Sequence, residues 1–145
     1  MYLSKENLIL KLRHYCAYQD RCQSEVEQKL RKLGADEEME GEVILHLLQE
    51  GFLNEERFAK SYARGKFRHL QWGRIKIRAG LQAKKVSEPL LKIAMMEIDE
   101  NEYRQTLHQL LERDMEHYGD KSKVIQHLLA KGFEYELILE SMKTM

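Results

Sequence analysis

The 145-residue sequence predicts an all-α protein made of three tandem three-helix repeats. Apolar residues recur at helical spacing along almost the whole chain, and alternating strand patterns are hard to find. The same succession of apolar stripes also starts three times, and corresponding residues such as Ile77 and Val124, or Leu81 and Leu128, lie 47 positions apart. A unit of three short helices buries little apolar surface alone. We therefore expect adjacent units to share contacts and to form an elongated, curved array.

The first unit is expected to span residues 1–52. Its three stripes are Leu8, Leu12, Tyr15 and Cys16, then Val26, Leu30 and Leu33, then Val43, Ile44, Leu47 and Leu48. Gly34 follows the second stripe, where a left-handed C-terminal cap is expected. Val26 and Ile77 are 51 positions apart, because the first unit has four extra residues around Asp36 to Glu42. We expect this insertion to lie in a turn.

The second unit is expected to span residues 53–99. Its stripes are Phe58, Tyr62 and Phe67, then Ile77 and Leu81, then Leu90, Leu91, Ala94 and Met95. Asn54 and Ser87 each precede acidic residues and are expected to be helix N-caps. Lys85 stands where the other units have glycine. Because non-glycine residues tolerate the left-handed conformation poorly, we expect a different cap there.

The third unit is expected to span residues 100–145. Its stripes are Tyr103, Leu107, Leu110, Leu111 and Met115, then Val124, Ile125, Leu128 and Leu129, then Leu137, Ile138 and Met142. Gly132 is expected to be a left-handed cap, as Gly34 is. Trp72-Gly73 and Tyr118-Gly119 each precede a second helix, and we interpret them as matching joints.

Charge is segregated along the chain, although the formal net charge is zero. Residues 35–56 contain eight acidic residues and no Lys or Arg, whereas residues 57–85 contain ten basic residues and no Asp or Glu. The basic run consists of Arg57, Lys60, Arg64, Lys66, Arg68, Arg74, Lys76, Arg78, Lys84 and Lys85. A run of one sign is typical of a surface that binds an anionic partner, so these residues and Trp72 are the candidate binding residues.

Two alternatives stay open for this segment. The basic side chains would be ordinary solvated faces if the acidic insertion pairs with them within the molecule. Phe58 and Tyr62, four residues apart, are expected in the core. Trp72 either packs the joint between two helices or anchors a partner.

Several functional classes are disfavoured by the sequence. It contains no glycine-rich phosphate loop, nucleophile elbow or His-Glu-x-x-His motif, so we expect neither an enzyme nor a cofactor. Cys16 and Cys22 are expected to be buried and free, and no paired ligand spacing predicts a metal site. The longest apolar runs are too short to span a membrane, and the N-terminus lacks the pattern of a signal peptide. We therefore expect a cytoplasmic location.

The order of these motifs resembles the RecX family of regulatory proteins. The run Gly51-Phe-Leu-Asn-Glu-Glu-Arg-Phe-Ala-Lys-Ser-Tyr62, followed by a basic segment and Arg74-Ile-Lys-Ile-Arg-Ala-Gly-Leu81, is similar to the family's central signature. Lys123-Val-Ile-Gln-His-Leu-Leu-Ala-Lys-Gly-Phe133 is similar to its C-terminal repeat. The resemblance extends from about Leu8 to Met142. Lys85, the acidic insertion and the less basic composition depart from the family pattern.

The resemblance implies a RecA filament on single-stranded DNA as the partner. It implies a curved module that lies in the helical groove of the filament and restrains ATP hydrolysis, strand exchange and co-protease activity. We expect a monomer, and a weak direct contact with DNA stays open. The alternative is a DNA-binding helical module without sequence specificity, since no helix has a clear cluster of Asn, Gln and Arg for reading bases.

Overall fold

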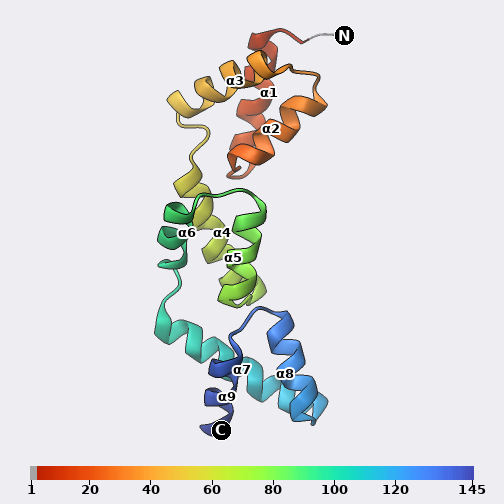
Figure 1. Cartoon of the computed structure of the whole chain (residues 1–145), viewed down its shortest axis with the longest axis vertical. Coiled ribbons are helices and arrows are strands. Elements are labelled where there is room, and N and C mark those ends of the chain that lie inside the picture. The colour runs from red at the N-terminus through yellow and green to blue at the C-terminus, as the bar shows by residue number, and fades with distance from the viewer. Residues whose placement is uncertain (1–2) are drawn as a thin grey trace.

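The computed structural model describes residues 3–145, which form nine α-helices and no strand. The helices are α1 (Lys5–Tyr18), α2 (Gln23–Lys32), α3 (Glu37–Gln49), α4 (Glu55–Leu70), α5 (Arg74–Ala83), α6 (Glu88–Met95), α7 (Glu100–Tyr118), α8 (Lys121–Ala130) and α9 (Tyr135–Lys143). They form three successive groups of three along the long axis of the molecule (Figure 1). The predicted all-α fold of tandem three-helix units is therefore confirmed.

The helix starts follow the predicted capping chemistry in part. The Arg57 amide donates to Asn54 Oδ1 (2.9 Å), so Asn54 is the N-cap of α4 as expected. Ser87 occupies the N-cap position of α6 in an extended conformation, but its side chain makes no capping hydrogen bond. Pro89 in the first turn of α6 offers no amide hydrogen, which reduces the number of groups that a cap must satisfy.

The second helices of all three units end in the same left-handed turn. Gly34 and Gly132 have φ values of 88° and 99°, as predicted. Lys85 also has a positive φ, 63°, so the expectation of a different cap in the second unit is wrong. The turn keeps its hydrogen bond, because the Val86 amide donates to the Leu81 carbonyl (3.1 Å). That hydrogen bond and the burial of the Val86 side chain, which is 6 % exposed, offset the strain of a lysine in this conformation.

The four-residue insertion of the first unit lies in a helix, which corrects the expectation of a turn. It lengthens α3 to 13 residues, against eight in α6 and nine in α9. The Asp36 side chain accepts a hydrogen bond from the Met39 amide, and Glu37, Glu38 and Glu40 lie in the first turn. Carboxylates at a helix N-terminus interact favourably with the helix dipole, so these acidic residues extend the helix.

The two aromatic-glycine joints are not equivalent, contrary to our interpretation of the sequence. Gly73 is extended and is the N-cap of α5, whereas Gly119 has φ 68° and ends α7. In the second unit Gln71 takes the left-handed conformation instead, with φ 55°. The left-handed residue that ends the first helix of the unit therefore precedes Trp72 in the second unit but follows Tyr118 in the third.

The apolar side chains form two cores. One is formed by α1–α3 together with Leu53, and the other extends without a break through α4–α9. Phe58 is buried in the second core and Tyr62 packs against it, as predicted. Cys16 and Cys22 are free and buried, and burial raises the pKa of each thiol. Cys22 packs with the second core although it precedes α2, so it helps to join the first two units.

The joint between the second and third units is a direct contact of backbones. The Gly73 amide donates to the Lys131 carbonyl (2.7 Å), and the Ile75 amide donates to the Gly132 carbonyl (3.0 Å). A Cβ atom at Gly73 would overlap the backbone of Gly132. Glycine at both positions therefore lets the start of α5 reach the turn between α8 and α9.

The joint between the first and second units is polar. The Gln23 amide donates to Glu55 Oε1 (2.6 Å), and Ser24 Oγ donates to the Lys84 carbonyl (2.8 Å). The start of α2 thus meets the turn between α5 and α6, as the start of α5 meets the turn between α8 and α9. The same elements meet at both contacts between units. The hydrogen bonds join two backbone groups between the second and third units, whereas each involves one side chain between the first and second units.

Candidate functional site

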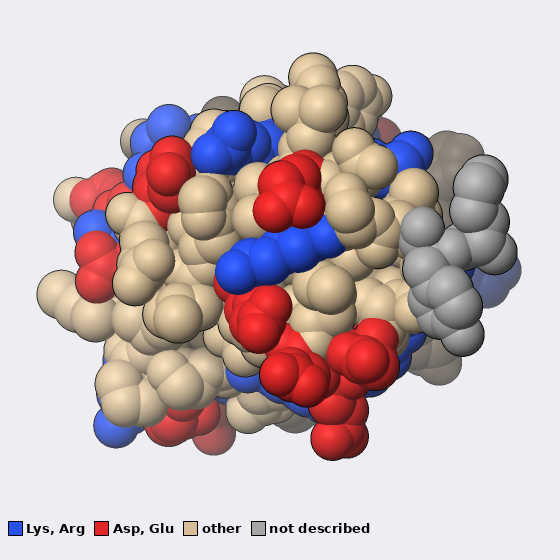
Figure 2. All heavy atoms as spheres, turned by 90° about the horizontal axis from the view of Figure 1, so that it is seen from above, with Lys and Arg blue, Asp and Glu red and all other residues tan. Residues whose placement is uncertain are grey.

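Most of the basic run is engaged in ion pairs within the molecule. Seven of its ten residues lie within ion-pair distance of a carboxylate: Arg57 with Asp20, Lys60 with Glu56, Arg64 with Glu97, Arg68 with Glu102, Arg74 with Glu100 and Glu134, Arg78 with Glu88, and Lys84 with Glu25. The acidic insertion does not supply these partners, because Glu40 pairs with Arg31 and Glu42 with Lys5. Charges of both signs are intermingled on the N-terminal end of the molecule (Figure 2).

Two of the candidate residues stabilise the contact between the first and second units. Arg57 Nε lies 2.8 Å from Asp20 Oδ1, and its Nη2 donates to the carbonyls of Gly51 and Phe52. Lys84 Nζ lies 3.4 Å from Glu25 Oε2, across the same joint. These two charges are neutralised by carboxylates of the first unit, so they contribute little to a field that would attract an anionic partner.

Arg74 stabilises the contact between the second and third units. Its guanidinium lies 3.9 Å from the centre of the Tyr103 ring, and its Nη1 donates to Glu134 Oε2 (2.9 Å). Tyr103 is fully buried, and its hydroxyl accepts from the Arg74 amide (3.0 Å) and donates to Glu134. Burial, and after it the hydrogen bond to Glu134, raises the pKa of Tyr103, so the hydroxyl stays protonated. Arg74 is therefore a structural residue of this joint.

Three lysines of the run form no ion pair within residues 3–145, and two of them lie against Trp72. Lys66 Nζ is 5.0 Å and Lys76 Nζ is 4.4 Å from the Trp72 ring. The ring also meets Tyr62 edge to face, with centroids 6.5 Å apart. We call Tyr62, Lys66, Trp72 and Lys76 the Trp72 cluster. Trp72 is half-buried, so it both packs the joint and presents a surface.

The Trp72 cluster can attract anions, because neither Lys66 nor Lys76 forms an ion pair with a carboxylate of residues 3–145. Cations over an aromatic face are held in place by the ring quadrupole, and the exposed part of the ring offers an apolar surface. Lys85, the third free lysine, is exposed at the turn after α5. Of the eleven candidates, Lys66, Lys76 and Lys85 are the basic residues without an ion pair among residues 3–145, and Trp72 is the aromatic residue.

Lys131 is a neighbour of this cluster that the sequence reasoning missed. It lies in the turn after α8, and its Nζ donates to the Leu70 carbonyl (3.2 Å). Burial, together with the positive charges of Arg113 and Lys76, lowers its pKa. The neighbouring Gly132 packs directly against Lys76 of the cluster. Lys131 is 47 positions after Lys84, so the repeat register would have pointed to it.

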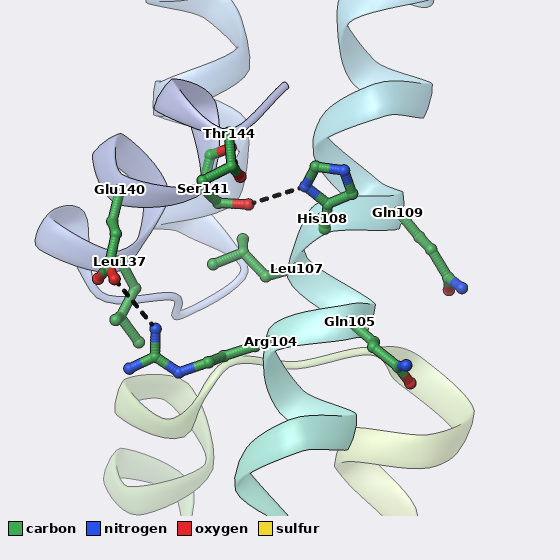
Figure 3. Close-up of a pocket in the computed structure, with 9 residues that line it drawn as sticks. All are labelled: Arg104, Gln105, Leu107, His108, Gln109, Leu137, Glu140, Ser141 and Thr144. Atoms are coloured by element: carbon green, nitrogen blue, oxygen red, sulfur yellow. Dashed lines mark hydrogen bonds and ion pairs between the residues drawn. The ribbon is translucent and has the colours of Figure 1, made fainter.

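A hollow of about 450 Å³ lies between α7 and α9 (Figure 3). Arg104 reaches Glu140 (3.5 Å) on one side, and His108 Nδ1 lies 3.3 Å from Ser141 Oγ on the other. Leu107 and Leu137 form the floor. Arg104 and His108 of α7 are therefore each paired with a residue of α9, and the charges of Arg104 and Glu140 offset each other.

No group of three or more metal-ligating side chains occurs in the part of the chain that the structure describes. Within the same residues Asp114 is the buried carboxylate, 3 % exposed, and its Oδ2 lies 2.5 Å from His127 Nδ1. This pair links α7 to α8 inside the third unit. None of the described helices is both long and apolar enough to cross a membrane.

The fold defines a helical-repeat protein built from three-helix units. Residues 54–95, which include α4–α6, match the family described as "RecX, second three-helix domain". The crystal structure of RecX from Lactobacillus salivarius superposes with a TM-score of 0.86 at 26 % identity, covering 97 % of this chain and 95 % of that one. The chain belongs to the RecX family.

Curated relatives agree with this assignment. The chain is 29 % identical over 131 residues to the regulatory protein RecX of Geobacillus kaustophilus, covering 86 % of this chain and 49 % of the relative. It is 30 % identical over 138 residues to that of Bacillus cytotoxicus, covering 89 % and 51 %. The chain thus spans about half the length of these curated relatives, which carry the name of a regulatory protein rather than of an enzyme.

Proposed function

We propose that this protein binds the RecA nucleoprotein filament on single-stranded DNA, lies in its helical groove, and restrains ATP hydrolysis, strand exchange and co-protease activity. The observation that carries the proposal is the likeness to RecX over nearly the whole chain, at both the sequence and the structural level. The elongated stack of units supports it, because stacked repeats offer a long surface to an extended partner. The proposal places the protein in the bacterial cytoplasm as a monomer.

The Trp72 cluster is the proposed contact surface. Its lysines form no ion pair with residues 3–145, and together with Lys85 they would steer the protein towards phosphates or an acidic protein surface. Arg57, Arg74 and Lys84 support the joints instead. The binding residues expected from the sequence are thereby divided between contact with the partner and stability of the array.

The test is single-strand-dependent ATP hydrolysis by RecA of the same organism, with and without this protein. We expect the wild-type protein to lower the steady-state rate, and Lys66→Glu/Lys76→Glu to need at least about tenfold more protein for the same effect, because surface charges act mainly on association. The matched control is Lys123→Glu/Lys143→Glu, which reverses two exposed lysines of the third unit. An unchanged rate with the wild-type protein contradicts the proposal.

A DNA-binding module without a protein partner is the second candidate, and the free lysines around Trp72 are the observation that favours it. Binding through phosphates alone weakens steeply as salt rises, whereas an interface that also buries apolar and hydrogen-bonded contacts persists to higher salt. Measuring the effect on RecA over a salt series, beside binding to bare DNA, separates the two. If the effect on RecA and the affinity for bare DNA fall equally steeply as salt rises, the DNA-binding module is favoured.

A further inference from the structure

The first unit carries a groove that the basic run of the sequence does not reach. It lies between α1 and α2, has a volume of about 440 Å³ and is within the size range of ligand pockets, which is roughly 300–1,000 Å³. Three cationic side chains, Lys11, Arg21 and Lys29, and two tyrosines, Tyr15 and Tyr18, contribute to its lining. Among the residues that the structure describes, no carboxylate lines it.

The cations of this groove are held in place without being neutralised. The Arg21 guanidinium lies 3.8 Å from the centre of the Tyr15 ring, and its Nε donates to the Tyr15 carbonyl (3.1 Å). Lys29 Nζ lies over the same ring at 5.5 Å. Neither of them, nor Lys11, forms an ion pair with any residue from 3 to 145. Most arginines of the second unit, by contrast, are paired with carboxylates.

Tyr18 gives the groove an exposed aromatic surface. The residue is 83 % exposed at the end of α1, although tyrosine is usually at least half buried, and the Arg21 guanidinium lies 6.0 Å from its ring. An exposed ring beside free cations is the combination on which bases of a single strand stack while its phosphates are bound. An acidic peptide would use the cations but would leave the ring without a partner.

The groove corresponds in the repeat to the Trp72 cluster. Arg21 and Trp72 are 51 positions apart, as are Tyr15 and Lys66, and this is the offset between the second helices of the two units. The α1–α2 turn also connects the two surfaces, because Gln19 and Asp20 of that turn line a hollow together with Lys66. Two carboxylates, Asp20 and Glu25, line this hollow, and each is paired with a cation: Asp20 with Arg57 and Glu25 with Lys84.

We propose that the groove between α1 and α2 binds single-stranded nucleic acid, with phosphates at Lys11, Arg21 and Lys29 and a base stacked on Tyr18. The strand continues past the α1–α2 turn to the Trp72 cluster. This binding needs no RecA and adds a site that the second candidate function does not name. It and the proposed action on the RecA filament can each fail while the other holds.

The experiment measures fluorescence anisotropy of a labelled thymidine oligonucleotide of about 15 nucleotides, and of an abasic oligonucleotide of the same length, with the full chain and no RecA. We expect the wild-type protein to bind the thymidine strand more tightly than the abasic one, by roughly tenfold, because stacking requires bases. Tyr18→Ala should weaken binding of the thymidine strand and leave the abasic strand unchanged. Lys11→Gln/Lys29→Gln should weaken both, and lower the slope of log Kd against log salt by about 0.7 per lost phosphate contact.

The matched control is Lys123→Gln/Tyr135→Ala/Lys143→Gln, which removes two lysines and one exposed tyrosine from the third unit. We expect it to bind as the wild type does, and circular dichroism checks that every variant keeps its helicity. If Tyr18→Ala changes neither strand or both equally, or if the control loses as much affinity, the proposal is overturned. It is also overturned if the wild type does not bind at low salt, and loss of the effect on RecA in the groove variants would then assign the groove to an acidic protein surface.

Discussion

At Gly73 the close approach of two units depends on the absence of a single Cβ atom. A side chain there would overlap the backbone of Gly132, and it would break the pair of backbone hydrogen bonds that joins α5 to the turn after α8. Gly132 is doubly restricted, because its φ of 99° is also strained for any other residue. From the sequence we interpreted Trp72-Gly73 as a joint between two helices of one unit, whereas in the structure Gly73 also forms a tightly packed contact with the next unit.

We expect Gly73→Ala to lower the free energy of unfolding by about 2 kcal/mol or more, since overpacking is added to the loss of hydrogen bonds. Urea denaturation followed by circular dichroism measures it. Gly41→Ala is the control: Gly41 is inside α3, a Cβ atom there would have no heavy atom within 4 Å, and alanine should raise stability by about 0.5–1 kcal/mol. Similar changes in the free energy of unfolding for the two variants would show that the contact between the units accommodates a side chain at Gly73 at little cost.

At the scale of single elements, the first residue of α4, Glu55, has only one of its two carboxylate oxygens hydrogen-bonded at the contact between the first and second units. Glu55 Oε1 accepts from the Gln23 amide, but Oε2 is buried and has no hydrogen-bond partner among residues 3–145. Burial, the largest cause, raises the pKa of Glu55 above its ordinary value of 4.5. The folded state therefore binds this proton more tightly than the unfolded state does.

This shift predicts a pH dependence of the joint. The contribution of Glu55 to stability is fully present below pH 4.5 and is lost as the pH rises through the higher folded-state pKa. Glu55→Gln keeps an oxygen acceptor for the Gln23 amide and removes the buried charge. We expect it to be more stable than the wild type at pH 7 and to lack this part of the pH dependence, as measured by thermal unfolding from pH 4 to 7. A variant that is less stable at pH 7 would contradict the assignment.

For the whole molecule, the two cores predict two unfolding units rather than three. The helices α1–α3 enclose their own core, whereas α4–α9 share one. The structure therefore couples the second and third units more closely than the first and second. The boundaries at residues 52/53 and 99/100 stay predictions.

Leu47→Asp and Leu128→Asp test this coupling, because both residues are fully buried, one in each core, and a charge there has no partner. We expect Leu47→Asp to remove hydrogen-exchange protection from α1–α3 while α4–α9 stay protected. Leu128→Asp should remove protection throughout α4–α9. Protection that persists in α4–α6 of the second variant would show that these units fold separately.

The sequence by itself determined the helical class, the succession of helices and the repeat, because apolar spacing and caps such as Asn54 and Gly34 are local signals. It also identified most of the core. Leu48 and Leu129, assigned to stripes, are 42 % exposed, while Leu53 and Phe133 in the turns are buried. A stripe indicates which face is apolar, but only the neighbouring helices decide how far burial extends.

Only the tertiary structure decided which basic residues are free. The partners of Arg57, Arg64 and Arg74 come from distant segments, so a run of one sign along the chain carries no information about pairing in space. For the same reason the groove around Tyr18 was not predicted: its cations are distributed over α1, α2 and the turn between them, and folding brings them together. Local periodicity is readable along the chain, whereas electrostatic neutralisation depends on contacts between units.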